Sequence, residues 1–190
     1  MIIQVDANDI EVFRKYLSLP HLDIHIHSDL GSQINEHSKI IHAHLLEVKK
    51  RYPHSLASSI SHTKGLGGFC YVTNQSSASI GIGLDIEESA RVRPEIIHRV
   101  RFNDEEINQM PSAGSLWTAK ESVFKSLRGE TQPIVVTSLH IGSWKRISSH
   151  IETFELINKS EFKVLTGLGM ILQKNDYQIA IFCCELNYST

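Results

Sequence analysis

Three short segments of the chain combine residue types that can hold a metal ion, bind phosphate or move a proton. In the first, an apolar, glycine-containing run ends in Asp85 and Glu87, which lie two positions apart. Residues two apart on a β-strand share a face, so both carboxylates would project together while Leu84 and Ile86 point into the core. A hard divalent cation would relieve their mutual repulsion, and the glycines would let another backbone or a ligand approach closely. The alternative is a strand that runs into a solvated acidic turn.

The second segment is a predicted helix over 115–127 with an acid and a base on one face. An apolar stripe predicts one buried side, and Trp117, Glu121 and Lys125 follow each other at intervals of four residues beside it. Glu121 would then be a third metal ligand, and Lys125 a phosphate ligand one helical turn away. The alternative is a surface ion pair between Glu121 and Lys125, worth roughly a few tenths of a kcal/mol.

The third segment, Ser59-Ile60-Ser61-His62-Thr63-Lys64-Gly65, places hydroxyls, an imidazole and an ammonium together at the end of a predicted strand. Neutral and charged donors of this kind can bind phosphate oxygens. Adjacent residues of a strand face opposite ways, so Ser61 and His62 do not indicate a hydrolytic triad. A polar strand end without a function is the alternative.

The elements that would position these segments mix helix and strand without regular alternation. Helices are predicted at about 6–17, 36–51, 94–102 and 115–127, with a short one beginning at 103, and strands at 55–62, 68–73, 78–87, 133–141, 151–157 and 177–186. This order predicts an α+β fold. A polar break near 74–80 divides the chain into an N-terminal half, 1–76, and a C-terminal half, 77–190.

The composition is that of an ordinary soluble protein with no global attraction to polyanions. Hydrophobic residues make up 41% of the chain, charged residues 21%, and the net charge is −2, so neither nucleic acid nor membrane is an expected partner. The acidic N-terminus lacks the pattern of a secretory signal, which predicts a cytoplasmic protein. Cys70, Cys183 and Cys184 lie in apolar runs and are expected to be reduced thiols.

Taken together and in this order, the three segments resemble the 4'-phosphopantetheinyl transferase superfamily. Its pattern is an SHS or SHT element, then G(I/V)D(I/V)E, then W(S/T/C)xKE(A/S)xxK. The chain carries Ser61-His62-Thr63, Gly83-Leu84-Asp85-Ile86-Glu87 and Trp117-Thr118-Ala119-Lys120-Glu121-Ser122-Val123-Phe124-Lys125. The length and the Asp-x-Glu pair look like the surfactin-synthetase-activating type, a monomer of two similar halves packed as a pseudo-dimer. The resemblance covers about residues 58–145.

The resemblance implies transfer of the phosphopantetheine group of coenzyme A to a serine of an apo-acyl or apo-peptidyl carrier protein, with release of 3',5'-ADP. Asp85, Glu87 and Glu121 would hold Mg²⁺, and Glu121 would also deprotonate the serine, with Lys125 as the second catalytic residue. Coenzyme A would bind between the halves. Its expected contacts are Ser61, His62, Lys64, Asp85, Lys120 and Lys125, with Lys49 and Arg51 as basic candidates in the first half.

The resemblance also implies an acidic carrier protein, for which a group of arginines near the cleft is a candidate contact, unless they form only a solvated helix face. These arginines are Arg91, Arg93, Arg99 and Arg101. The usual basic nucleotide-binding elements are not clear in the first half, so a degenerate subunit that only binds coenzyme A or a carrier is the second hypothesis.

A third hypothesis comes from Asp23-Ile24-His25-Ile26-His27, which resembles a metal-binding strand of metallohydrolases. The chain is too short for a TIM barrel, however, and no later set of ligands completes such a site.

Overall fold

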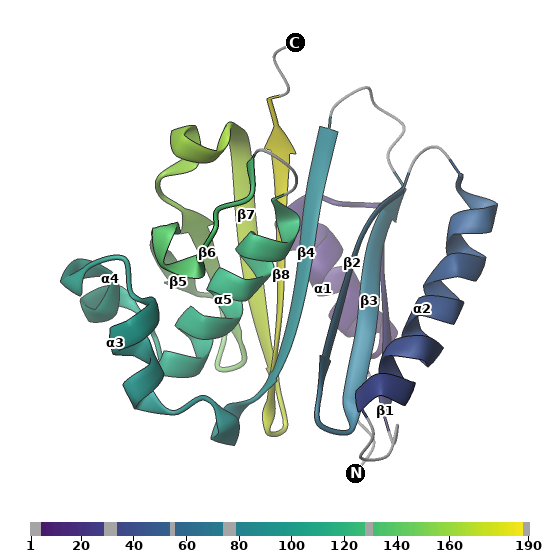
Figure 1. The fold of residues 1–190 in the computed structure, drawn as a ribbon, viewed down its shortest axis with the longest axis horizontal. Helices are drawn as coiled ribbons and strands as arrows, with labels where there is room; N and C mark the ends of the chain where they lie inside the picture. The colour runs from purple at the N-terminus through teal and green to yellow at the C-terminus, as the bar shows by residue number, and fades with distance from the viewer. Residues whose placement is uncertain (1–4, 29–33, 54–55, 74–78, 128–130, 188–190) are drawn as a thin grey trace.

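The computed structural model describes residues 5–28, 34–53, 56–73, 79–127 and 131–187, with side chains from residue 36 onward in the second of these ranges. Figure 1 shows helices packed on two antiparallel sheets. The helices are α1 (Ala7–Leu17), α2 (Ile34–Arg51), α3 (Ile97–Val100), α4 (Asp104–Gln109) and α5 (Ala113–Ser126). The strands are β1 (Leu22–Ser28), β2 (Leu56–Thr63), β3 (Leu66–Thr73), β4 (Ser79–Glu88), β5 (Ile141–Arg146), β6 (Ile151–Leu156), β7 (Val164–Lys174) and β8 (Tyr177–Leu186). The α+β class is therefore confirmed.

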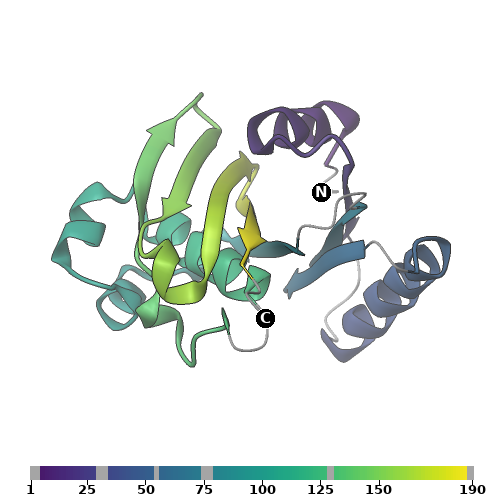
Figure 2. The same ribbon diagram turned by 90° about the horizontal axis from the view of Figure 1, so that it is seen from above.

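The first sheet has the order β1-β3-β2 and lies between α1 and α2 (Figure 2). Successive residues of a strand face opposite sides, so neighbours on β3 enter different cores. Phe69 packs with Ile41 and Leu45 of α2, whereas Cys70 belongs to a core that includes Phe13 of α1. Both faces of this small sheet are thereby covered by helices.

The second sheet has the order β4-β8-β7-β6-β5. On one face, Val123 of α5 packs against Phe182 of β8. On the other face, Ile181 of β8 joins the core that contains α1. Figure 1 shows this arrangement, with α5 in front of the sheet and α1 behind it.

The two sheets meet along β2 and β4, which lie side by side in Figure 1. The Leu84 N–H donates to Ser59 Oγ at 2.9 Å, and the Ile86 N–H donates to Ser61 Oγ at 3.1 Å. Residue numbers rise together along both strands, so the strands run parallel. Serine side chains thus satisfy backbone groups that a neighbouring strand would otherwise bind.

Helix α5 lies directly against β4 because two residues of β4 are glycines. A Cβ atom at Gly83 would lie 1.8 Å from the Ser122 carbonyl oxygen, and one at Gly81 would lie 2.4 Å from the Ser126 carbonyl oxygen. The close approach expected of these glycines is confirmed, and the approaching backbone is that of α5. This close packing brings the face of α5 that carries the motif residues to the acidic end of β4.

Several element boundaries predicted from the sequence were wrong. The helix expected over 94–102 is a 3₁₀ turn, Pro94–Ile96, followed by the single turn of α3. The strand expected over 133–141 is absent from residues 133–140, and β5 begins at its last residue. Helix α5 begins two residues earlier than expected, with Ser112 as its N-cap. Strand β7 was not predicted.

The expected division between residues 76 and 77 lies outside the described residues, and it stays a prediction. The parts on either side of it differ in size, with three strands in the first sheet and five in the second. In the described ranges, no helix is both long and apolar enough to cross a bilayer.

Candidate functional site

Asp85 lies at the junction of the two sheets and is almost fully buried, with 3% of its surface exposed. Its Oδ1 accepts hydrogen bonds from the Lys125 ammonium at 2.6 Å and from the Ser61 hydroxyl at 3.0 Å. Burial raises the pKa of Asp85, and the contacts with Lys125 and Ser61 oppose that shift only in part. One strand of each sheet and one helix therefore contribute to the surroundings of a single carboxylate.

Glu87 projects beside Asp85, as the strand alternation predicted. Its Oε1 accepts a hydrogen bond of 3.1 Å from the Trp117 indole N–H. Burial raises the pKa of Glu87, and repulsion by Asp85 raises it further, whereas Trp117 lowers it. The sequence singled out Trp117 by its spacing and as the first residue of the third motif, whereas its role as a donor to Glu87 depends on the packing of α5 on β4.

Glu121 comes to the same place from α5, half-buried and one turn before Lys125. Burial raises the pKa of Glu121, repulsion by Asp85 and Glu87 adds to this rise, and Lys125 opposes it. The three acids are therefore close enough to repel one another. The structure thus brings together Asp85, Glu87, Glu121 and Lys125, which the sequence placed in two separate segments.

The acids offer the donors that Mg²⁺ prefers. Asp85 Oδ2 is buried and has no hydrogen-bond partner, although Oδ1 has two. A buried carboxylate oxygen without a partner is costly, and a cation would satisfy it. In the described part of the chain, no three His, Cys, Asp or Glu side chains are arranged to hold an ion by themselves. The support for a cation at this place is therefore the unpartnered Asp85 Oδ2 and the carboxylate donors, not a complete set of protein ligands.

The Ser-His-Thr segment divides between the interior and the surface. Ser61 is buried, with 2% of its surface exposed, whereas His62 is exposed. The pKa of His62 is lowered mainly by desolvation and further by the charges of Lys125, His37 and His42. A neutral imidazole is therefore favoured at neutral pH, where it can still donate one hydrogen bond to a phosphate oxygen.

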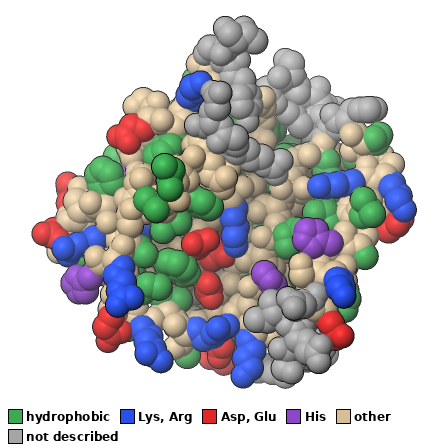
Figure 3. Space-filling view, viewed as in Figure 1, with side chains coloured by type: hydrophobic (Ala, Val, Ile, Leu, Met, Phe, Trp, Pro, Cys, Tyr) green, Lys and Arg blue, Asp and Glu red, His purple; other side chains and the backbone are tan. Residues whose placement is uncertain are grey.

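A pocket of about 470 Å³ opens beside this cluster, and α2, β2 and α5 line it. Its lining includes Lys49 of α2, Lys125 of α5 and Ser58, Ser59 and Ile60 of β2. Figure 3 shows acidic side chains in the middle of this face, with basic side chains next to them. The pocket thus joins a basic candidate of the first half to the acidic cluster.

One of the predicted coenzyme A contacts, Lys120, is engaged elsewhere. Lys120 is fully buried, and its ammonium donates to Glu106 at 2.9 Å and to the Leu139 carbonyl. Arg51 ends α2, where its charge acts on His44. Lys64 is exposed in the turn after β2. The roles of Arg51 and Lys64 stay predictions.

The sequence did not predict two contacts that organise the site. Ser59 mirrors the backbone contact of Ser61, and Arg91 donates to Thr63 Oγ1 at 3.0 Å, which ties the end of β4 to the Ser-His-Thr segment. The Ser-x-Ser spacing on β2 was a possible signal for the first contact, since it places both hydroxyls on one face. Nothing in the sequence indicated that Arg91 would bind Thr63.

The Asp-x-His-x-His segment packs between β1 and α2. His27 and His44 lie 3.2 Å apart through ring nitrogens, and the His25 ring stacks on Phe69 at 4.7 Å between centroids. The side chains of His25, His27 and His44 are half-buried. The described residues contain no barrel and no three-ligand metal site, so the metallohydrolase hypothesis gains no support.

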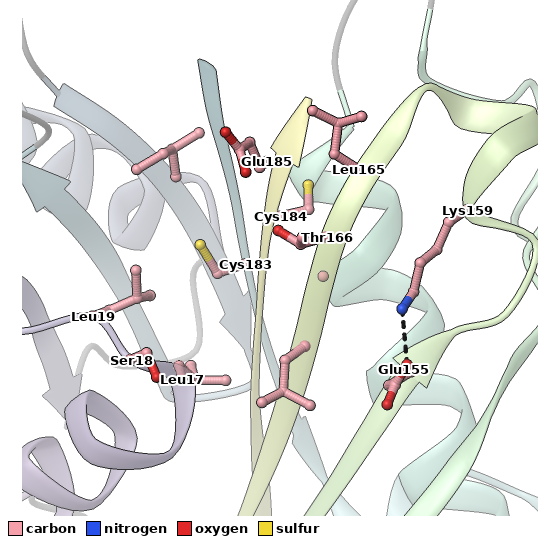
Figure 4. A pocket seen from close by; sticks show the side chains of 13 residues that line it. Leu17, Ser18, Leu19, Glu155, Lys159, Leu165, Thr166, Cys183, Cys184 and Glu185 are labelled. Atoms are coloured by element: carbon pink, nitrogen blue, oxygen red, sulfur yellow. Dashed lines mark hydrogen bonds and ion pairs between the residues drawn. The ribbon is translucent and has the colours of Figure 1, made fainter. Parts of the chain in front are cut away.

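A larger pocket, of about 600 Å³, lies between the end of α1 and strands β7 and β8 (Figure 4). Its wall includes Leu19, Leu165, Cys183 and an ion pair of 2.8 Å between Glu155 and Lys159. None of the motif residues line it, so it has no part in the chemistry considered below.

The cysteines are free thiols, as expected. Burial raises the pKa of Cys183 to about 12 and that of Cys184 to about 11, so both are protonated at neutral pH. Burial also raises the pKa of Cys70. These thiols therefore contribute packing and no nucleophile.

Comparison with known proteins agrees with the geometry of the acidic cluster. No curated protein sequence matches the chain significantly. A family model, described as the 4'-phosphopantetheinyl transferase superfamily, matches residues 81–182, which is more than half of the chain. The matched region includes the Asp-x-Glu pair of β4 and the whole of α5. The chain belongs to the 4'-phosphopantetheinyl transferase superfamily.

Proposed function

We propose that the protein transfers the 4'-phosphopantetheine group of coenzyme A to a serine of an apo-carrier protein and releases 3',5'-ADP. The supporting observation is the convergence of Asp85, Glu87, Glu121 and Lys125 where the two sheets meet, next to a pocket that Lys125 also lines. We further propose the surfactin-synthetase-activating type, with two related halves in a cytoplasmic monomer. The halves would correspond to residues 1–76 and 77–190.

Asp85, Glu87 and Glu121 would hold Mg²⁺, with Asp85 contributing Oδ2. Bound there, the ion supplies charge neutralisation to the pyrophosphate of coenzyme A. The donor set supports this assignment because all three groups are carboxylates, and burial makes their repulsion expensive without a cation. Most of the acceleration would come from positioning and charge neutralisation, as in other phosphoryl transfers.

Lys125 and His62 would bind phosphate oxygens, one as a charged donor and the other as a neutral donor. The carrier serine oxygen attacks the β-phosphorus, the bond from this phosphorus to the ADP oxygen breaks, and the serine proton passes to Glu121. Glu121 is suited to this role because its carboxylate lies beside Asp85, Glu87 and Lys125. The nucleotide would extend into the pocket between α2, β2 and α5, where Lys49 supplies a second positive charge.

The carrier would dock on the arginines that follow β4. Arg91, Arg93 and Arg99 line a pocket of about 330 Å³, whereas Arg101 pairs with Asp104 at 2.8 Å. Within the described ranges, the guanidinium groups of these three arginines form no ion pair with a carboxylate, so they suit an acidic surface around the carrier serine. A rim of this kind would chiefly raise the rate of association.

The test mixes the purified protein with coenzyme A, Mg²⁺ and apo-carrier proteins of the fatty-acid, polyketide and peptide-synthetase types. Mass spectrometry of the carriers should show the added phosphopantetheine group, and a carrier with alanine in place of its serine should show none. If no carrier gains mass while coenzyme A still binds, the second hypothesis, a degenerate binding subunit, replaces the enzyme.

A further inference from the structure

Two serines of β2 form the same bond to the backbone of β4. Ser59 Oγ accepts the Leu84 N–H at 2.9 Å, and Ser61 Oγ accepts the Ile86 N–H at 3.1 Å. Both serines are buried, at 8% and 2% exposure. They are two positions apart on one face of the strand, so each supports the junction of the sheets in the same way.

Ser61 differs from Ser59 in using the whole bonding capacity of its hydroxyl. A hydroxyl has one proton to donate and two lone pairs that accept. The Ile86 N–H and the Lys125 ammonium, at 3.0 Å, occupy the two lone pairs. The single proton then points to Asp85 Oδ1 at 3.0 Å. Nothing remains with which this hydroxyl can bind a phosphate oxygen.

The same contacts fix the orientation of the Asp85 carboxylate. Ser61 and Lys125 both bind Oδ1, and this leaves Oδ2 as the buried oxygen without a partner. A donor that holds one oxygen of a carboxylate directs the other toward a cation. Ser59 instead binds the Leu84 N–H, and among the described residues it forms no hydrogen bond with this carboxylate.

We propose that Ser61 is a positioning residue that orients Asp85 toward a divalent cation, rather than a contact of coenzyme A. The inference rests on the proposed function in so far as that function places the cation on Asp85. Because the Ser61 oxygen also receives the backbone of β4, the orientation of the metal ligand depends on the docking of the two sheets.

The test compares Ser61→Ala with Ser59→Ala as a matched control. Each variant leaves one β4 N–H without its acceptor, so thermal unfolding should show a similar loss of stability in both. Binding of Mn²⁺ alone, measured by electron paramagnetic resonance without coenzyme A, should weaken by about 10–100-fold in Ser61→Ala, as for other groups that orient metal ligands. In Ser59→Ala it should stay within about threefold of the unchanged protein.

A second variant, Ser61→Cys, keeps nearly the same volume and replaces the hydroxyl by a weaker donor and acceptor. It should also weaken Mn²⁺ binding, and it serves if Ser61→Ala does not fold. Unchanged Mn²⁺ affinity in the folded Ser61 variants, or equal weakening in both alanine variants, overturns the inference. So does a higher KM for coenzyme A at unchanged Mn²⁺ affinity, because that result makes Ser61 a substrate contact.

The Mn²⁺ measurement also separates the two proposals. If the unchanged protein modifies no carrier but binds Mn²⁺, and only the Ser61 variants weaken that binding, the proposed function fails and the role of Ser61 stands. If the unchanged protein binds no Mn²⁺, the role of Ser61 is rejected whatever the transfer assay shows.

Discussion

Glu121 is the residue whose substitution tests the proposed proton transfer most directly. Glu121→Gln keeps the size of the side chain and removes its basicity, so transfer should fall by about 10²–10⁴-fold. The melting temperature without metal should not fall, because the substitution removes a carboxylate whose pKa is raised by burial and by its acidic neighbours. Carrier modification followed by mass spectrometry measures the first effect, and circular dichroism the second.

The exposed Glu105 of α4 provides a matched control for this substitution. Glu105→Gln removes the same charge at a surface position, and transfer should stay within about twofold. Near-normal turnover of Glu121→Gln would remove Glu121 from the mechanism.

Lys120 is a motif residue whose surroundings indicate a structural role. Its ammonium is buried against Glu106, which also accepts the backbone N–H groups of Phe102 and Ile141. Lys120→Met would leave Glu106 buried without its cation, and we expect a loss of about 3–5 kcal/mol in the free energy of unfolding. Urea titration measures this loss.

The double variant Lys120→Met with Glu106→Gln removes both charges and should recover part of the lost stability, which a single-residue effect does not predict. In the folded fraction of the single variant, the KM for coenzyme A should stay nearly unchanged. A raised KM with normal stability would instead support the contact with coenzyme A that the sequence led us to expect.

At the scale of elements, the contact between α5 and β4 decides whether the acids and Lys125 meet. Gly83→Ala would place a Cβ atom 1.8 Å from the Ser122 carbonyl oxygen, and this backbone atom cannot move without the helix. We expect a loss of at least about 1–3 kcal/mol in the free energy of unfolding and a large loss of transfer, because the helix must shift away from Asp85. Urea titration and the carrier assay measure the two effects.

Gly142→Ala on β5 is the corresponding control. Its Cβ would lie 3.0 Å from a side-chain carbon of Ile157, which is partly exposed and can turn aside. The loss of stability should be smaller and transfer should be kept. If Gly83→Ala is as active as Gly142→Ala, close packing of α5 on β4 is not required for the site.

The local sequence predicted the elements of the site well because their patterns and their packing agree. The apolar stripe of α5 faces the core, and the apolar run that ends at Asp85 is a strand that is buried on both faces. Their meeting could be expected from the glycines of β4. The roles of Ser61 and Trp117 could not, because a hydrogen-bond partner from a distant segment is fixed only when the sheets are placed.

The errors of prediction occurred where local propensity and tertiary packing disagree. In β7, Gly167 and Gly169 resemble turn residues, yet they leave room for the rings of Phe182 and Phe154 in a central strand. Ile134 and Val135 favour a strand, but no strand partners them and Ile134 is 97% exposed. Propensity is a weak guide in both cases because burial determines the outcome.

At the scale of the whole molecule, the pocket and the buried carboxylates lie where the sheets meet. Strand β4 is part of the second sheet, on which α5 packs, and β2 is part of the first sheet, on which α2 packs. Residues from both sheets and both helices surround the site. Neither part contains a complete set of phosphate and metal contacts. Stability of the junction and occupancy of the site should therefore affect each other.

Because occupancy of the site affects the stability of the junction, stabilisation of the protein by a metal ion should depend on pH. Burial raises the pKa values of Asp85, Glu87 and Glu121 above the ordinary 3.8 and 4.5. A carboxyl with a raised pKa in the folded state contributes stability that is complete below its unfolded pKa and is lost as pH rises through the folded pKa. The metal-free protein therefore loses this contribution above about pH 4, and a bound cation compensates for the loss.

Mg²⁺ or Mn²⁺ should accordingly raise the melting temperature more at pH 8 than at pH 5, where protons compete for the same oxygens. Melting curves with and without metal, recorded at each pH, measure the metal-induced change in melting temperature. Because the two curves of a pair are recorded at the same pH, the effects of carboxylates outside the site cancel. Glu121→Gln should reduce the difference between the two pH values. An equal shift at both, or a larger shift at pH 5, would contradict cation binding by these acids.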